Sequence, residues 1–92
     1  MTEEHLSALI QAAEAKKDAD GWWSFDEGRH LTLHVVAEGA LLSVSRIVAL
    51  KDAGTLLHAR TERGEIFIVE RAHAFAGSVD APSRGGRKAG FR

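Results

Sequence analysis

Cysteine is absent from this chain of 92 residues, and its absence excludes several classes of protein at once. A chain without thiols has no disulfide scaffold, no thiolate zinc site and no cysteine nucleophile. Net charge is also nearly absent, because 12 basic and 13 acidic residues leave −1. The composition as a whole therefore gives no electrostatic argument for binding nucleic acid or an anionic membrane. A cysteine-free composition fits a reducing compartment, and we expect a cytoplasmic protein.

Long apolar runs are missing as well. No stretch approaches the roughly 20 apolar residues of a membrane-spanning helix, and residues 1–5 are acidic rather than typical of a secretory signal. We therefore expect no membrane partner. The hydrophobic fraction of 45% lies in the globular range. A chain of this length builds one domain and not two with separate cores, so we predict a single domain over residues 1–82.

The motifs of nucleophilic and nucleotide chemistry are missing too. Ser43 and Ser45 lie in a strand pattern without a glycine elbow, and Ser24 lies between aromatic residues. Gly85 and Gly86 have no helix after them, so they do not form a phosphate loop. We predict no catalytic residue and no cofactor, which leaves an enzyme as the third hypothesis.

One acidic segment resembles a calcium loop of the EF-hand type. Asp18, Asp20 and Glu27 fall at ligand positions when the loop is aligned on Gly21. The first ligand position is Lys16, however, which is a positive charge where calcium needs a carboxylate. The segment is better explained as the turn that ends a helix.

Three histidines are candidate metal ligands by residue type. His30 and His34 share one face of a predicted strand, but four residues along a strand span about 13 Å. His58, on another strand, is the only candidate that would bridge them. We interpret these side chains as polar positions on a solvated face, and we predict no metal site.

The first element is predicted to be an amphipathic helix over about residues 3–17. Thr2 is a suitable N-cap, and acidic residues follow it in the first turn. The apolar residues at helical spacing are Leu6, Leu9, Ile10 and Ala13. Lys16 and Lys17 are placed in the last turn, where positive charge is favoured.

From residue 22 onward the pattern has period two and frequent turns, which predicts antiparallel strands. The expected strands are Trp22–Phe25, His30–Ala37, Leu41–Leu50, Thr55–Thr61, Glu65–Glu70 and Phe75–Val79. The third of these changes phase near Arg46, where we expect a bulge or sharp bend. Residues Arg71–His73 make a short connection before the last strand.

The run from Ile66 to Val69 is apolar on both faces, whereas an antiparallel strand with one wet face alternates. A single thin helix covers only one face. The sheet is therefore expected to curl into a small barrel or to be covered by a partner chain. The predicted fold is mainly β with one N-terminal helix, as a five- or six-stranded antiparallel meander closed into a barrel.

This order of elements resembles the Sm-like and SH3-like small barrels over roughly residues 30–79. The resemblance is carried by Leu33-x-Val35, Glu38-Gly39, Gly64-Glu65-x-Phe67-Ile68, His73 and Ala76. The Asp and Asn with which Sm-like proteins hold a base have no counterpart between Ala40 and Leu50, so the resemblance implies no RNA site. A weaker resemblance to LytTR DNA-binding domains runs through Val44-x-x-Ile47 and Thr61-x-x-Gly64.

Two features are typical of contact surfaces. Trp22 and Trp23 are adjacent, so in a strand they point to opposite faces, and an exposed tryptophan is a common interface anchor. A flexible basic tail is predicted at residues 83–92, with its positive charges at Arg84, Arg87, Lys88 and Arg92.

The leading hypothesis is a non-catalytic module that binds another protein or a second copy of itself. The alternative is a nucleic-acid-binding barrel that uses the basic tail.

Overall fold

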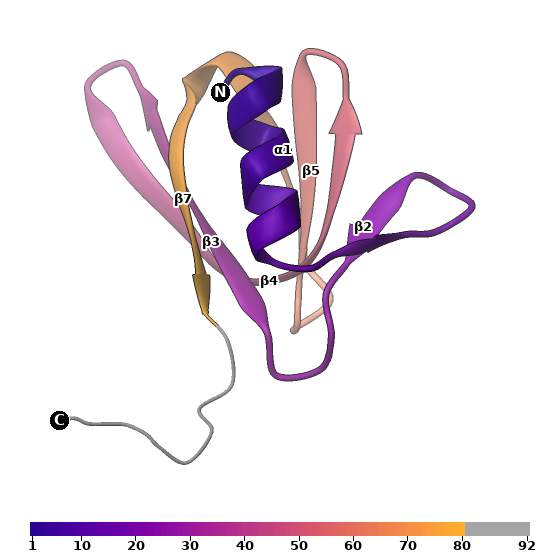
Figure 1. Ribbon diagram of the computed structural model, residues 1–92. Helices are drawn as coiled ribbons and strands as arrows, with labels where there is room; N and C mark the ends of the chain where they lie inside the picture. Colours follow the sequence, from indigo (N-terminus) through magenta and orange to yellow (C-terminus); the bar gives the residue numbers. More distant parts are fainter. Residues whose placement is uncertain (81–92) are drawn as a thin grey trace, which may run out of the picture.

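The computed structural model describes residues 1–80, in which one N-terminal helix lies across one face of an antiparallel sheet (Figure 1). This confirms the mainly β architecture with one helix. The basic tail expected at residues 83–92 lies outside the described residues. Within residues 1–80, no helix has the length and apolar character needed to cross a bilayer.

Helix α1 spans Glu3–Ala12 and begins at the expected cap, because the hydroxyl of Thr2 accepts a hydrogen bond from the backbone N–H of His5. It is shorter than the range 3–17 expected from the sequence. Glu14 has a φ of +53°, a left-handed conformation that does not continue a helix. Arg29 then donates to the carbonyl oxygen of Ala13 at 3.3 Å, which places a positive charge at the end of the helix.

The two lysines predicted in the last helical turn belong instead to a strand. Lys16 and Lys17 form β1 and pair with Ser24 and Trp23 of β2. A tight turn joins the two strands, in which the carboxylate of Asp18 accepts hydrogen bonds from two backbone N–H groups. The acidic segment therefore serves to reverse the chain.

Within residues 1–80 the sheet has seven strands, and every pairing among them is antiparallel. The bounds are β1 Lys16–Lys17, β2 Trp22–Ser24, β3 His30–Ala37, β4 Ala40–Ala53, β5 Leu56–Thr61, β6 Ile66–Glu70 and β7 Ala74–Asp80, with a short 3-10 helix, η1, at Arg71–His73. The order is β1-β2-β4-β3-β7, while β5 pairs with β4 and β6 pairs with β5.

Strand β4 changes partners at a bulge, which confirms the irregularity predicted near Arg46. The register between β3 and β4 shifts there, and Arg46 has a φ of +56°. Before the bulge β4 pairs with β3; after it, Ile47 still pairs with Leu31 of β3, and from Ala49 onward β4 lies between β2 and β5. The guanidinium of Arg46 donates to the Glu62 carboxylate at 2.7 Å, which ties the bulge to the turn after β5.

The core lies between α1 and the face of the sheet that the helix covers. The largest fully buried side chains are Leu31, Leu33, Ile47, Leu50 and Leu57. Leu6 and Leu9 pack against the same cluster from the side of α1. The alternation of buried and exposed positions along β3 and β5 follows the period-two pattern of the sequence.

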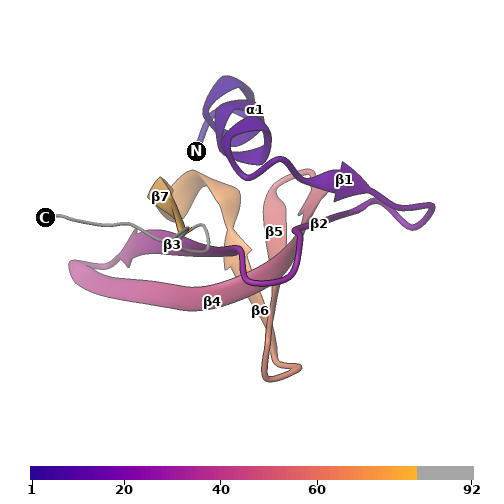
Figure 2. The same ribbon diagram turned by 60° about the horizontal axis from the view of Figure 1, so that its bottom comes forward.

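The sheet is open, and the closed SH3-like or Sm-like barrel expected from the sequence is not formed within residues 1–80. Strand β7 pairs with β3 and strand β6 with β5, but β6 and β7 do not pair with each other. Figure 2 shows the turn of the β5–β6 hairpin on the side of the sheet away from α1. Within residues 1–80, the cover predicted on both faces of Ile66–Val69 is only partly supplied: Val69 packs against the core, while Ile66, Phe67 and Ile68 stay exposed.

Candidate interaction surface

Strand β6 is an edge strand whose apolar side chains lie on the surface. Ile66 is 52% exposed, Ile68 is 58% exposed, and Phe67 is 37% exposed. One side of the strand pairs with β5, and its other side has no strand beside it among residues 1–80. We call this unpaired side, with its three exposed apolar residues, the β6 edge. Such an edge presents unpaired backbone groups together with apolar surface.

The three side chains belong to both faces of the sheet. Ile66 and Ile68 pair with Arg60 and His58 of β5, on the face away from the helix, while Phe67 pairs with the buried Ala59. A layer stacked on one face of the sheet would contact only part of this set, whereas a strand placed beside β6 would contact side chains on both faces.

Other strand edges of the sheet are less suited to pairing. The first half of β4 has no strand opposite β3 among the described residues, but the bulge at Arg46 interrupts it. The ladder between β7 and β3 shifts register near Val35, and β7 carries small residues such as Ala76 and Gly77. Bulges blunt an edge against pairing. The β5–β6 ladder runs without a register shift from Arg60↔Ile66 to Leu56↔Glu70.

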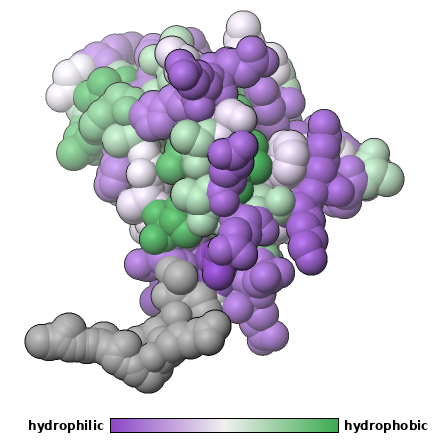
Figure 3. All heavy atoms as spheres, viewed as in Figure 1, coloured by the Kyte–Doolittle hydropathy of each residue, from purple (hydrophilic) through white to green (hydrophobic). Residues whose placement is uncertain are grey.

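A second apolar area lies where β3 meets β4. We call it the hairpin patch, and it consists of Val36, Leu41, Leu42 and Phe75, all of which are exposed. Figure 3 shows apolar surface over this end of the β3–β4 hairpin, at its upper left. Leu41 pairs with Val36 and Leu42 with Val35, so the two leucines point to opposite faces and do not form one flat surface. Sequence reasoning missed this patch, because alternation along the strands predicted one buried face.

The tryptophan pair lies on opposite faces, as predicted. Trp22 is covered by cations, with the Arg60 guanidinium 4.4 Å from its ring centroid and the Lys51 ammonium at 5.9 Å. His58 approaches it edge-on at 6.3 Å. These side chains of the same chain occupy the face of the Trp22 indole. Less of the ring is therefore available to anchor a partner.

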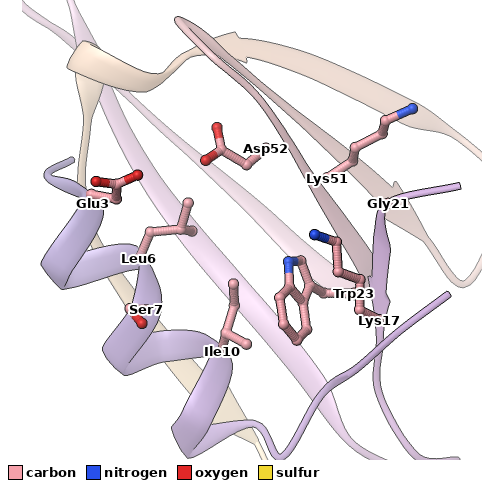
Figure 4. A pocket seen from close by; sticks show the side chains of 9 residues that line it. All are labelled: Glu3, Leu6, Ser7, Ile10, Lys17, Gly21, Trp23, Lys51 and Asp52. Carbon is pink, nitrogen blue, oxygen red and sulfur yellow. The ribbon is translucent and has the colours of Figure 1, made fainter. Parts of the chain in front are cut away.

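Trp23 lines a groove of about 300 Å³ between α1 and β2. In Figure 4 its indole points toward the helix, where Leu6 and Ile10 face it. The groove is apolar at its centre and carries charges of both signs at its margins, from Glu3, Lys17, Lys51 and Asp52. Lys17 lies over the Trp23 ring at 5.6 Å. Mixed charges select no particular class of ligand.

The histidines lie against different partners. His34 Nδ1 is 2.9 Å from Ser43 Oγ on an exposed face, His30 Nε2 is 3.4 Å from a Glu62 oxygen, and His58 contacts Trp22. Sequence reasoning did not foresee the pairing of His34 with Ser43. Within residues 1–80, no three histidine or acidic side chains are grouped so that they could hold a metal ion.

One titratable group near the bulge is shifted. The hydrogen bond from Arg46 lowers the pKa of the Glu62 carboxyl below its usual value, and the charges of Arg46 and His30 act in the same direction. Burial opposes this shift of the pKa. The cluster links the bend of β4 to the turn that precedes β6, in the hairpin that carries the β6 edge.

Arg84, Arg87, Lys88 and Arg92, the basic residues predicted as a contact surface, lie outside the described residues. The described residues carry 8 basic and 13 acidic side chains, a net charge of −5. No family model, curated protein or solved structure matches this chain.

Proposed function

We propose that this chain is a non-catalytic protein-interaction module that binds a second polypeptide strand along the β6 edge. The observation that carries the proposal is the exposure of Ile66, Phe67 and Ile68 on a strand whose second side is unpaired among residues 1–80. Strand addition satisfies the unpaired backbone groups and removes apolar surface from water on both faces at once. The bound strand belongs either to another protein or to a second copy of the chain.

We interpret the fold as a small barrel that has opened between β6 and β7. This interpretation is supported by the bend of β4 at Arg46, by η1 between β6 and β7, and by the return of β7 to pair with β3. In a closed barrel β6 would lie against β7. In the open sheet β7 does not pair with β6, so a strand from another chain can pair with that side of β6 instead.

The nucleic-acid alternative has less support. A protein that binds phosphates needs concentrated positive charge, whereas the described residues carry a net charge of −5. Its aromatic platform would be Trp22, but Arg60 covers that ring at 4.4 Å. The alternative therefore depends on the four basic residues of the tail.

The test compares the full chain with two variants that each place a lysine at an exposed apolar position. Ile68→Lys introduces a charge on the β6 edge, and Leu41→Lys introduces the same charge on the hairpin patch, where Leu41 is 66% exposed. Association is measured by analytical ultracentrifugation over a range of concentrations, and by cross-linking in extracts of the source cells.

We expect Ile68→Lys alone to abolish self-association or the capture of a partner, because a charge at the centre of a strand interface is costly to bury. Circular dichroism should show both variants folded, since each replaced side chain is exposed. The proposal fails if wild type and Ile68→Lys associate to the same extent in both assays.

A further inference from the structure

Three exposed residues at the centre of the β6 edge read the same in both directions, as Ile66-Phe67-Ile68. An antiparallel strand runs in the opposite direction to its neighbour, so a second copy of this segment presents the same apolar residues in the same order. The edge is in this sense complementary to itself. We therefore propose that β6 pairs with β6 of a second copy of the chain, in a two-fold symmetric dimer. This inference rests on the proposed function.

Two-fold symmetry limits how the two strands can align. A two-fold axis perpendicular to the sheet sets one residue directly opposite its own copy. With Phe67 opposite Phe67 of the partner copy, Ile66 faces Ile68 of that copy, and the same pair occurs again on the other side of the axis. All three exposed apolar residues then face apolar residues. Such cross-strand pairs are the units that stabilise a sheet.

The neighbouring symmetric alignments are poorer. An axis at Ile66 sets Phe67 opposite Glu65 of the other copy. An axis at Ile68 sets Ile66, which is 52% exposed, opposite Glu70, which lies within the strand. Each therefore places a carboxylate inside the paired segment, where it loses water. The axis at Phe67 also sets Glu65 opposite Val69, but two residues from the axis, at the end of the paired segment. There the exposed Glu65 lies outside β6 and next to the turn, so its carboxylate stays near water.

The remainder of the chain leaves room for this arrangement. The turn of the β5–β6 hairpin lies away from α1 in Figure 2, and the second side of β6 has no strand beside it among residues 1–80. A second hairpin placed beside it continues the sheet through β5, β6, β6 of the copy and β5 of the copy. The dimer thus gives the exposed side chains of Ile66–Ile68 cross-strand neighbours on both faces of the sheet, which residues 1–80 of one chain do not supply.

The absence of cysteine makes the alignment directly measurable, because any introduced thiol is the only one in the chain. Three single variants of the full chain are needed: Ile66→Cys, Ile68→Cys and, as a control for random collision, Leu41→Cys on the hairpin patch. They are oxidised with oxidised glutathione, alone and in equimolar mixture, and the disulfide-linked dimers are quantified on non-reducing gels. Directly opposed strand residues lie within the Cα distance that a disulfide needs.

The expected result is that the mixture of Ile66→Cys and Ile68→Cys forms the cross-linked heterodimer about tenfold faster than Leu41→Cys forms its dimer, because the paired thiols are held at high effective concentration. Each of the two β6 variants alone should link no faster than Leu41→Cys. Fast linking of Ile68→Cys with itself, or equal rates in all samples, would overturn the proposed dimer.

The association and cross-linking experiments together distinguish the symmetric dimer from the broader proposal that the β6 edge binds a strand. If Ile68→Lys abolishes association while the mixed thiols do not link, the β6 edge binds a strand but not in this symmetric arrangement. If the wild-type chain neither associates nor captures a partner, the interaction function fails together with the dimer.

Discussion

Gly77 of β7 lies so close to Leu9 of α1 that a Cβ added at Gly77 would be 2.7 Å from the Leu9 Cδ1 atom. Leu9 is buried in the core, and the carbonyl oxygen of Thr32 would be a further 3.3 Å contact. The helix therefore docks on the sheet at the one position of β7 that has no side chain. The absence of a side chain at Gly77 lets α1 approach β7 closely.

Replacing Gly77 by alanine should destabilise the fold by about 1–3 kcal/mol, because overpacking forces Leu9 or the helix to move. Chemical denaturation followed by circular dichroism measures the change in the free energy of unfolding. Ser78→Ala, at an exposed neighbouring position, is the control and should change little. In the double variant with Leu9→Ala the cost of the added methyl group should largely vanish; an unchanged cost would show that the two residues do not clash.

The sequence predicted the order and type of nearly every element but not the way in which they close. Alternation identified β3 and β5, the change of phase near Arg46 located the bulge, and the polar turns separated the strands. The end of α1 was misplaced because Lys16 and Lys17 suit a last helical turn, and their role in β1 depends on pairing with the distant β2. Local patterns do not encode such pairings.

The candidate site was only partly visible in the sequence. The apolar run Ile66–Val69 indicated that β6 has apolar side chains on both faces. The two tryptophans were correctly placed on opposite faces. The cover of the Trp22 ring by Arg60 depends on the spatial order β2-β4-β5, which sequence periodicity does not determine. The choice between a closed barrel and an open edge depends on long-range curvature, which local patterns leave undetermined.

The Glu62 carboxyl should make part of the stability depend on pH. Its pKa is lowered in the folded chain, chiefly by the hydrogen bond from Arg46. The contribution to stability is therefore fully present above the unfolded pKa of 4.5 and is lost as the pH falls through the lower folded pKa. Urea denaturation should show wild type more stable than Glu62→Gln at neutral pH, with the difference shrinking under acid conditions. A difference that is independent of pH would contradict this assignment.

Trp22 and Arg60 should be energetically coupled, since the guanidinium lies 4.4 Å from the ring centroid. A double-mutant cycle with Trp22→Leu and Arg60→Met should give a coupling of about 0.5–1 kcal/mol in the free energy of unfolding. The matched cycle with Lys51→Met should give less, because that ammonium is more distant, at 5.9 Å. Zero coupling with Arg60 would restore Trp22 as a free anchor for a partner.

Neutralising the basic residues of the tail should leave self-association unchanged. The variant replaces Arg84, Arg87, Lys88 and Arg92 by glutamine in the full chain, and ultracentrifugation compares its dimer fraction with that of wild type. Nucleic-acid binding is measured in parallel across salt concentrations. If wild type binds with a logarithmic salt slope of about −3 to −4 and the variant does not, the nucleic-acid alternative would replace the present proposal.

The central claim, that a second copy of the chain completes the β6 edge, is tested most directly by amide hydrogen exchange of residues 66–70 at low and high protein concentration. Alternate amides of β6 point toward β5 or toward the unpaired side. We predict that the amides on the unpaired side become more protected as concentration rises, while those bonded to β5 stay protected throughout. Equal, concentration-independent exchange of the amides on the unpaired side would contradict the claim.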